Sequence, residues 1–163
     1  MIVCGGAQPS LLMIKRAEHP KDPWSGHMAF PGGRIEDSDA SALAAAIREV
    51  EEEVGLALSA TDLITPLSPR YTLRRGHRNQ VFVSPYVFFL DEKPVLSFNE
   101  EVAAVTYIPL RDLFDQSRYS SFEFSFESQS YQLPCFQHEI GRVWGLSLHF
   151  VNEFCRVIPH LLS

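Results

Sequence analysis

The sequence predicts a fold of the α+β class, a mixed α/β arrangement of strands and helices within a single domain, residues 1–163. Two segments have apolar residues at the 3.6-residue spacing of an amphipathic helix. Segments typical of strands precede, separate and follow these two helices, which is the pattern of mixed α/β folds. The chain has 163 residues, about the length of one domain, and shows no repeat, linker or low-complexity tract.

The N-terminal half is expected to hold two strands and the longest helix. Residues 10–16 (SLLMIKR) form a continuous apolar run with a basic end, typical of a buried strand. Residues 19–26 contain two prolines and a glycine and are therefore a loop, and residues 28–30 form a short apolar strand. Residues 40–54 are alanine-rich with an apolar stripe and form a helix, which Gly55 ends.

The C-terminal half is expected to hold mainly strands, with a short helix and a closing amphipathic helix. Pro85 lies within the first strand and indicates an edge or a bulge. Residues 109–115 form a short helix that begins with proline, and residues 147–158 form the last helix. The expected strands are residues 80–90, 101–108, 122–126, 131–136 and 140–144.

Composition excludes several classes of protein. A hydrophobic fraction of 45% and a charged fraction of 21% exclude a wholly disordered chain. No apolar run approaches the roughly 20 residues of a membrane span, and no leader is visible, so a cytoplasmic protein is expected. The net charge of −6 disfavours broad nucleic-acid binding. Cys4, Cys135 and Cys155 are too widely spaced for a zinc site and are expected to be core residues.

The predicted helix carries an acidic group. Glu49, Glu52 and Glu53 lie at i, i+3 and i+4, so they share one face, roughly 140° from the apolar stripe. Arg48 can reach Glu52 one turn later. Adjacent carboxylates repel one another, and a hard divalent cation such as Mg²⁺ removes that repulsion. A solvated acidic helix face is the alternative interpretation of the same pattern.

The segment around this helix resembles the box of the Nudix hydrolases, G-x5-E-x7-R-E-U-x-E-E-x-G-U, where U is apolar. The matching residues are Gly33, Arg48, Glu49, Val50, Glu52, Glu53, Gly55 and Leu56. Asp39 stands at the place of the first glutamate, with one extra residue before Arg48. A longer spacer with Asp at this place, together with the leader residues 30–33 (FPGG), is similar to the coenzyme A diphosphatase-like branch.

The resemblance implies both a fold and a mechanism. The fold is a Nudix-type α/β/α sandwich with a mixed sheet. Family members cleave a diphosphate by in-line attack of water, with Mg²⁺ or Mn²⁺ as cofactor. The resemblance assigns Glu49, Glu52 and Glu53 to the metal, with Glu52 and Glu53 catalytic. Arg48 corresponds to the arginine that orients these glutamates. Gly32 and Gly33 would provide the backbone bend over the helix.

Two groups outside the box are further candidates. In the family, a glutamate on a distant loop often completes the metal site or acts as the base, and Glu101 corresponds best; an exposed acidic pair with Glu100 is the alternative. A basic segment is a candidate for phosphate contacts, since arginine binds phosphate through two nitrogens, or else is a solvated loop. Its substrate-binding candidates are Arg70, Arg74, Arg75 and Arg78, with Lys15 and Arg16 as similar candidates elsewhere.

The expected function is metal-dependent hydrolysis of a nucleoside diphosphate derivative, a small-molecule partner. Coenzyme A or its thioesters would give 3′,5′-ADP and a phosphopantetheine product. The alternatives are an ADP-ribose or dinucleoside polyphosphate pyrophosphatase and a non-catalytic nucleotide-sensing module. Neither a nucleic-acid nor a membrane partner is expected, and a homodimer stays open. Trp144 and Trp24 are expected in the core, although an indole ring can also stack on a base.

Overall fold

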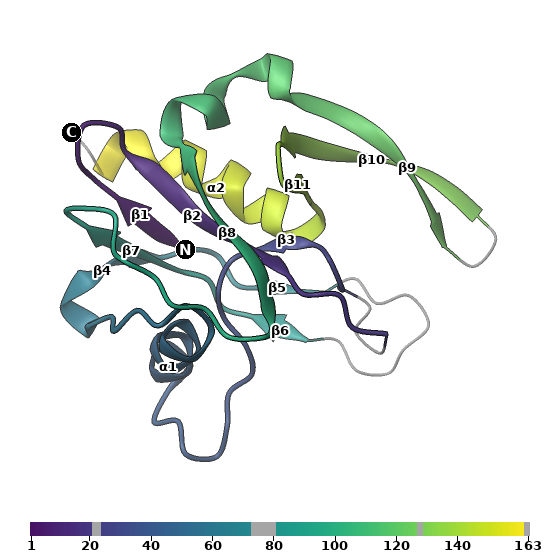
Figure 1. The fold of residues 1–163 in the computed structure, drawn as a ribbon. Coiled ribbons are helices and arrows are strands. Elements are labelled where there is room, and N and C mark those ends of the chain that lie inside the picture. Colours follow the sequence, from purple (N-terminus) through teal and green to yellow (C-terminus); the bar gives the residue numbers. More distant parts are fainter. Residues whose placement is uncertain (21–23, 73–80, 127–128, 162–163) are drawn as a thin grey trace.

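The computed structural model describes residues 1–20, 24–72, 81–126 and 129–161. Its centre is a six-stranded mixed sheet in the order β3-β2-β1-β7-β4, with β8 paired to the other edge of β2 (Figure 1). Strands β1 and β7 are parallel and the other pairs are antiparallel. The strands are β1 (Ile2–Cys4), β2 (Ser10–Arg16), β3 (Met28–Ala29), β4 (Leu63–Pro66), β7 (Tyr86–Leu90) and β8 (Val102–Pro109).

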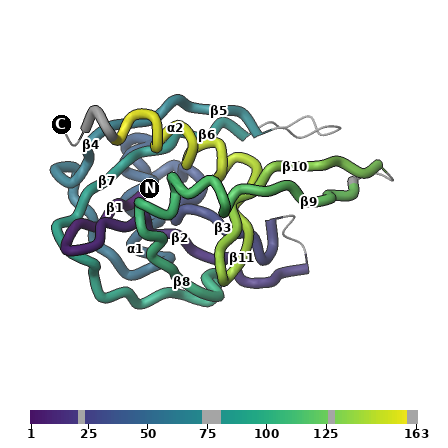
Figure 2. The backbone as a smooth tube through the Cα atoms, turned by 90° about the horizontal axis from the view of Figure 1, so that it is seen from above, coloured from purple at the N-terminus to yellow at the C-terminus, as the bar shows by residue number. Residues whose placement is uncertain are grey.

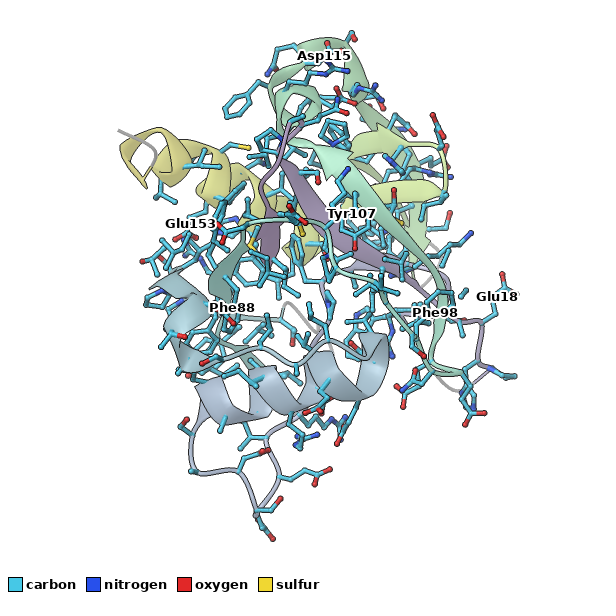
Figure 3. The ribbon with its side chains drawn as sticks, turned by 60° about the vertical axis from the view of Figure 1, so that its left-hand side comes forward. Glu18, Phe88, Phe98, Tyr107, Asp115 and Glu153 are labelled. Carbon is cyan, nitrogen blue, oxygen red and sulfur yellow. The ribbon has the colours of Figure 1, made fainter. Side chains whose placement is uncertain are left out.

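Two helices cover opposite faces of this sheet, α1 (Ala42–Val54) and α2 (Gly145–Leu161). Side chains of a strand alternate between the two faces, so β2 serves both layers. Leu12 and Ile14 pack in the core under α1, whereas Leu11 and Met13 pack in the core under α2. Phe88 of β7 lies between the sheet and α1 (Figure 3). The predicted mixed fold with a helix on each face is therefore confirmed.

The remaining strands form two smaller sheets at the side of the central one. The larger has the order β11-β10-β9, from β9 (Tyr119–Phe126), β10 (Gln129–His138) and β11 (Gly141–Trp144). The smaller pairs β5 (Arg70–Tyr71) with β6 (Phe82–Val83). Seen from above, the β9–β10 hairpin and the β5–β6 ribbon extend from the same end of the molecule (Figure 2).

Most predicted elements are present, with differences that have local causes. The strand at residues 10–16 is confirmed, and α1 begins at Ala42 because Ser41 caps it. The expected strand over 80–90 is two strands in its described part, with Pro85 in the break between them. The Pro85 carbonyl accepts from the Leu67 amide at 2.9 Å. The short helix after Pro109 is the 3-10 helix η2 (Leu110–Phe114). The last helix is longer than expected at both ends.

Three short strands, β1, β4 and β5, were not predicted from the sequence. Each has two to four residues, and such short runs have no periodicity of their own. Strand β1 is nevertheless fully buried, because β2 and β7 pair with its two edges. Two short 3-10 helices complete the described elements, η1 (Ala60–Asp62) and η3 (Gln116–Arg118). No helix in the described part of the chain is long and apolar enough to cross a membrane.

Candidate active site

The site is built at the C-terminal half of α1, where two loops meet the helix. Gly55 ends the helix in the left-handed conformation, with φ 67°. A Cβ there would lie 2.7 Å from the Ser97 carbonyl oxygen, so the close approach of this loop also requires glycine. The Ser97 amide donates to the Val54 carbonyl at 3.0 Å, and the Asn99 amide donates to the Glu53 carbonyl at 3.1 Å. The loop before β8 is thereby fixed to the end of the helix.

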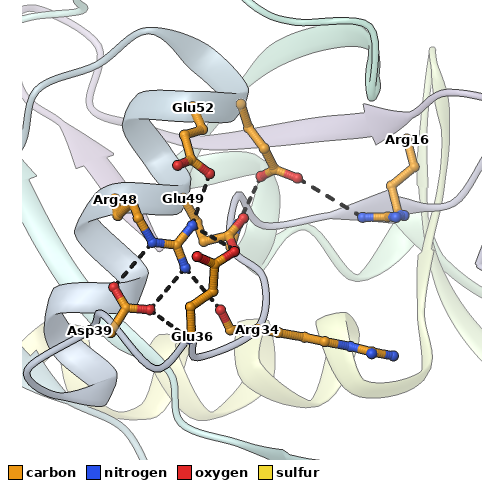
Figure 4. Close-up of polar contacts among 9 residues, drawn as sticks. Arg16, Arg34, Glu36, Asp39, Arg48, Glu49 and Glu52 are labelled. Atoms are coloured by element: carbon orange, nitrogen blue, oxygen red, sulfur yellow. Dashed lines mark hydrogen bonds and ion pairs between the residues drawn. The ribbon is translucent and has the colours of Figure 1, made fainter.

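Arg48 organises the polar side of α1 (Figure 4). One terminal nitrogen donates to Glu49 at 3.1 Å and to Glu52 at 2.9 Å, as the i, i+4 spacing predicts. The other terminal nitrogen donates to the Arg34 carbonyl at 2.9 Å. The side chain of Arg34 extends away from this group in the same view. Arg48 therefore ties the helix carboxylates to the loop that precedes the helix.

Asp39 is a further hydrogen-bond partner of Arg48. Its two oxygens accept from Arg48 Nε at 3.1 Å and from a terminal nitrogen at 2.9 Å, and one of them also accepts from the Glu36 amide at 2.8 Å. These hydrogen bonds lower the pKa of Asp39, and its partnership raises the pKa of Arg48, so both groups are charged. The aspartate at the place of the first box glutamate is thus a two-point partner of Arg48.

Glu53 is the buried carboxylate of the site, with 3% of its surface exposed. The Gly32 amide donates to one oxygen at 2.9 Å, and the Arg16 guanidinium lies 4.0 Å from the other. Burial raises the pKa of Glu53 to about 7, and the negative charges of Glu49 and Glu101 act in the same direction. The alternative of a solvated acidic face does not hold for Glu53, because the loop at Gly32 covers its carboxylate.

Gly32 and Gly33 are close to the carboxylates, as predicted for the loop. Gly32 has φ 149°, a conformation that side chains rarely adopt. A Cβ on Gly33 would lie 2.3 Å from the Glu49 carboxylate, so a side chain at this position would displace that carboxylate from its present place. The two glycines therefore bring main chain against two different glutamates of the helix.

Glu101 lies on the loop that is fixed to the helix end. Its amide donates to the Asn99 side chain at 2.9 Å, and its carbonyl accepts from the Ala17 amide at 2.8 Å. Its side chain is exposed, yet its charge contributes to the raised pKa of Glu53. No corresponding influence on Glu53 is found for Glu100. The main chain of Glu101 is therefore anchored while its side chain is exposed.

The carboxylates are only partly arranged for a metal ion. In the described residues, no three Asp, Glu, His or Cys side chains are close enough to hold one. Glu52 is half-exposed and turned towards Arg48, whereas Glu53 accepts from Gly32. Carboxylate oxygens are nevertheless the donors that a hard divalent cation prefers, and the charges of Glu49 and Glu101 act on Glu53.

The predicted basic segment lies mostly outside the described residues, which include neither Arg74, Arg75 nor Arg78. Arg70 is described and is exposed on β5. Burial opposes the ionisation of Glu153 on α2, but hydrogen bonds from Ser68 and, after them, the charge of Arg70 lower the pKa of that carboxyl. Arg16, a minor candidate from the sequence, lies beside Glu53. Its position at the basic end of the β2 strand could have indicated that it lies near the carboxylates. Asn99 was missed, because nothing in the sequence marks a loop residue that binds a helix end.

We expect Arg48→Lys to lower kcat by roughly 10- to 100-fold, the usual effect of losing a residue that holds functional side chains in position. A lysine ammonium cannot reproduce the two-point contact with Asp39 while also reaching Glu49 and Glu52. Steady-state kinetics and the melting temperature measure the effect. Arg34→Ala is the matched control, because Arg48 uses only its carbonyl oxygen. Equal losses in both variants would contradict the orienting role of Arg48.

Known proteins resemble this chain in sequence and in fold. The family model described as NUDIX domain matches residues 1–127. Over 147 residues the chain is 34% identical to NudL of Escherichia coli K12, named as an uncharacterized Nudix hydrolase, covering 90% of this chain and 73% of that protein.

Two solved structures share the fold. The MutT/nudix family protein of Enterococcus faecalis has a TM-score of 0.65 at 20% identity and covers 97% of this chain, which spans 60% of that protein. The NUDIX domain of Shewanella oneidensis NrtR, solved with ADP ribose, has a TM-score of 0.55 at 20% identity, covering 69% of this chain and 71% of that one.

Proposed function

This chain belongs to the Nudix family and is a hydrolase, and from that premise we propose that it hydrolyses the diphosphate bond of a small nucleoside diphosphate derivative. The observation that carries the proposal is the group of carboxylates that Arg48 organises beneath the Gly32–Gly33 loop. Residues 1–163 are proposed to act as one domain. Coenzyme A or a thioester of it is the first candidate substrate, supported by Asp39 at its box position and by the FPGG leader.

Nudix hydrolases generally use divalent metal ions, and Mg²⁺ or Mn²⁺ is the proposed cofactor here, held by Glu49, Glu53 and Glu52. When bound, such an ion supplies charge neutralisation for the diphosphate and favours the ionisation of water. To hold the metal ion, the Glu53 carboxylate must be charged. Burial opposes this ionisation, and the positive charge of Arg16 favours it. Glu52 would have to leave its present contact with Arg48.

The chain's own residues then have distinct roles in the reaction. Arg48 and Asp39 hold Glu49 and the helix in position. Glu101 projects from its anchored loop and is proposed to take the proton of the attacking water. The water oxygen forms a bond to one phosphorus, the bond from that phosphorus to the bridging oxygen breaks, and two phosphate monoesters leave. For coenzyme A these are 3′,5′-ADP and a phosphopantetheine product.

A substrate screen tests the proposal. We expect hydrolysis in the presence of Mg²⁺ or Mn²⁺, with the highest kcat/KM for coenzyme A among coenzyme A, ADP-ribose, NADH and diadenosine polyphosphates, and no turnover after chelation. Released products can be separated by chromatography. A higher kcat/KM for ADP-ribose or a dinucleoside polyphosphate would replace coenzyme A as the substrate. Nucleotide binding without any hydrolysis would instead indicate a sensing module.

A further inference from the structure

An aromatic cluster lies beside the candidate active site, formed by His27, Phe122, Phe124 and Trp144. Trp144 is its centre: its ring centroid lies 4.8 Å from His27, 5.4 Å from Phe122 and 5.0 Å from Phe124. The rings meet edge-on or tilted, as aromatic pairs prefer. Three separate segments contribute them: the loop before β3, strand β9 and the end of β11.

This cluster is not part of the hydrophobic core. None of its four residues belongs to either of the two core clusters of the described chain, and all four are half-buried. The expectation that Trp144 is a core residue is therefore wrong. The four rings remain partly in contact with water, so a flat apolar group could still pack against them.

The position of the cluster connects it to the carboxylates. The Arg16 amide donates to the His27 carbonyl at 3.0 Å, and the side chain of Arg16 lies 4.0 Å from Glu53. Strand β11 lies against β3 (Figure 1), and a Cβ on Gly141 would lie 3.0 Å from the Met28 side chain. Strand β3 leads within a few residues to the glycine loop over Glu53. A ligand with its phosphates at that loop can therefore extend towards the rings.

A cation also lies at the cluster. The Arg142 guanidinium stacks over the Phe122 ring at 4.6 Å from its centroid. An anionic sugar phosphate next to a flat base would find a positive charge and aromatic surface together. Aliphatic groups would gain from burial here, but they would gain nothing from the ring edges and the guanidinium. The combination favours a nucleotide over a purely aliphatic ligand.

We propose that the aromatic cluster is the subsite for the base of the substrate's nucleotide half, an inference that rests on the proposed function. Base–aromatic stacking depends on ring faces rather than on specific hydrogen bonds, and it accounts for about 5- to 150-fold in affinity per base by truncation of the ring. The subsite therefore selects for a nucleotide as a class. The glycine loop and the carboxylates act on the diphosphate.

Equilibrium dialysis with AMP and with ribose 5-phosphate, which lacks the base, tests the subsite without hydrolysis. The wild-type protein is expected to bind AMP more tightly than ribose 5-phosphate. Phe124→Leu is expected to weaken AMP binding by about 5- to 150-fold and to leave ribose 5-phosphate binding unchanged. Trp144→Phe, which keeps a ring at the centre, is expected to have a smaller effect. Circular dichroism melting establishes that each variant is folded.

Phe114→Leu is the matched control, because Phe114 is an aromatic residue of η2 with 50% of its surface exposed and no ring contact to the cluster. Equal binding of AMP and ribose 5-phosphate to the wild type would overturn the subsite, as would unchanged AMP binding in folded Phe124→Leu. The outcomes remain distinct from those of the substrate screen. Base-dependent AMP binding without turnover supports the subsite and contradicts hydrolysis. Turnover together with unchanged AMP binding in Phe124→Leu supports hydrolysis and contradicts the subsite.

Discussion

Glu53→Gln is expected to lower kcat at least about 100-fold while the fold persists, because a carboxylate that supports metal-assisted catalysis accounts for several kcal/mol in the transition state. The amide keeps an oxygen that can accept from Gly32, so the loop retains its hydrogen bond. Steady-state kinetics at saturating Mg²⁺ or Mn²⁺ measure the loss. Near-normal turnover would remove Glu53 from the catalytic groups. Glu51→Gln is the control, because Glu51 is an exposed neighbour on the same helix.

The same variant has a second, pH-dependent effect on stability in metal-free protein. The pKa of Glu53 is about 7 in the folded state, against an ordinary value of 4.5. Between these values the folded state holds a proton that the unfolded state releases, so the free energy of unfolding falls as pH rises through this range and then levels off. The full loss is at most about 3 kcal/mol.

Glutamine corresponds to the protonated state at every pH. Glu53→Gln should therefore raise the melting temperature of chelated protein at about pH 8 and have little effect at about pH 5, whereas Glu51→Gln should change neither. Differential scanning calorimetry measures both. A difference between variant and wild type that stays constant over this range would contradict the burial of the Glu53 carboxylate.

Glu101→Gln is expected to lower kcat by roughly 10²–10⁴, the usual range when a general base is lost. Substrate affinity should change little, because the main chain of Glu101 is held by Asn99 and Ala17 whatever its side chain is. Kinetics over a range of substrate concentrations separate kcat from KM. Glu100→Gln serves as the adjacent control and should be nearly silent. If the two variants behave alike, the base must lie on the α1 helix.

The helix and its polar groups could be predicted because their causes are local. Ser41 and Gly55 mark the ends of α1, and the i, i+4 spacing places Arg48 beside Glu52. The burial of Glu53 could not be predicted in this way. It follows from two loops distant in sequence that fold over the helix end, at Gly32 and at Asn99. Spacing along one helix carries no information about what covers it.

The small strands and the aromatic cluster were missed for the same reason. Strand β1 has three residues and is a strand only because β2 and β7 lie on its edges. A strand over residues 122–126 was predicted, but the sequence does not show that β11 brings Trp144 against Phe122 and Phe124. Which separate segments lie side by side depends on how all the strands of the sheet pair.

The loop before β8 has a consequence for how related sequences can differ in length. The Ser97 and Asn99 amides hold the loop to the helix end through main-chain atoms, so the separation of Glu53 and Glu101 is independent of most side chains between them. Residues inserted near Val95, which is 97% exposed, would extend into solvent and leave the rest of the loop in place. One residue added between Asn99 and Glu101 would shift the acid relative to the helix. Residues 99–101 therefore fix the position of Glu101 relative to the helix, whereas the loop near Val95 can change in length.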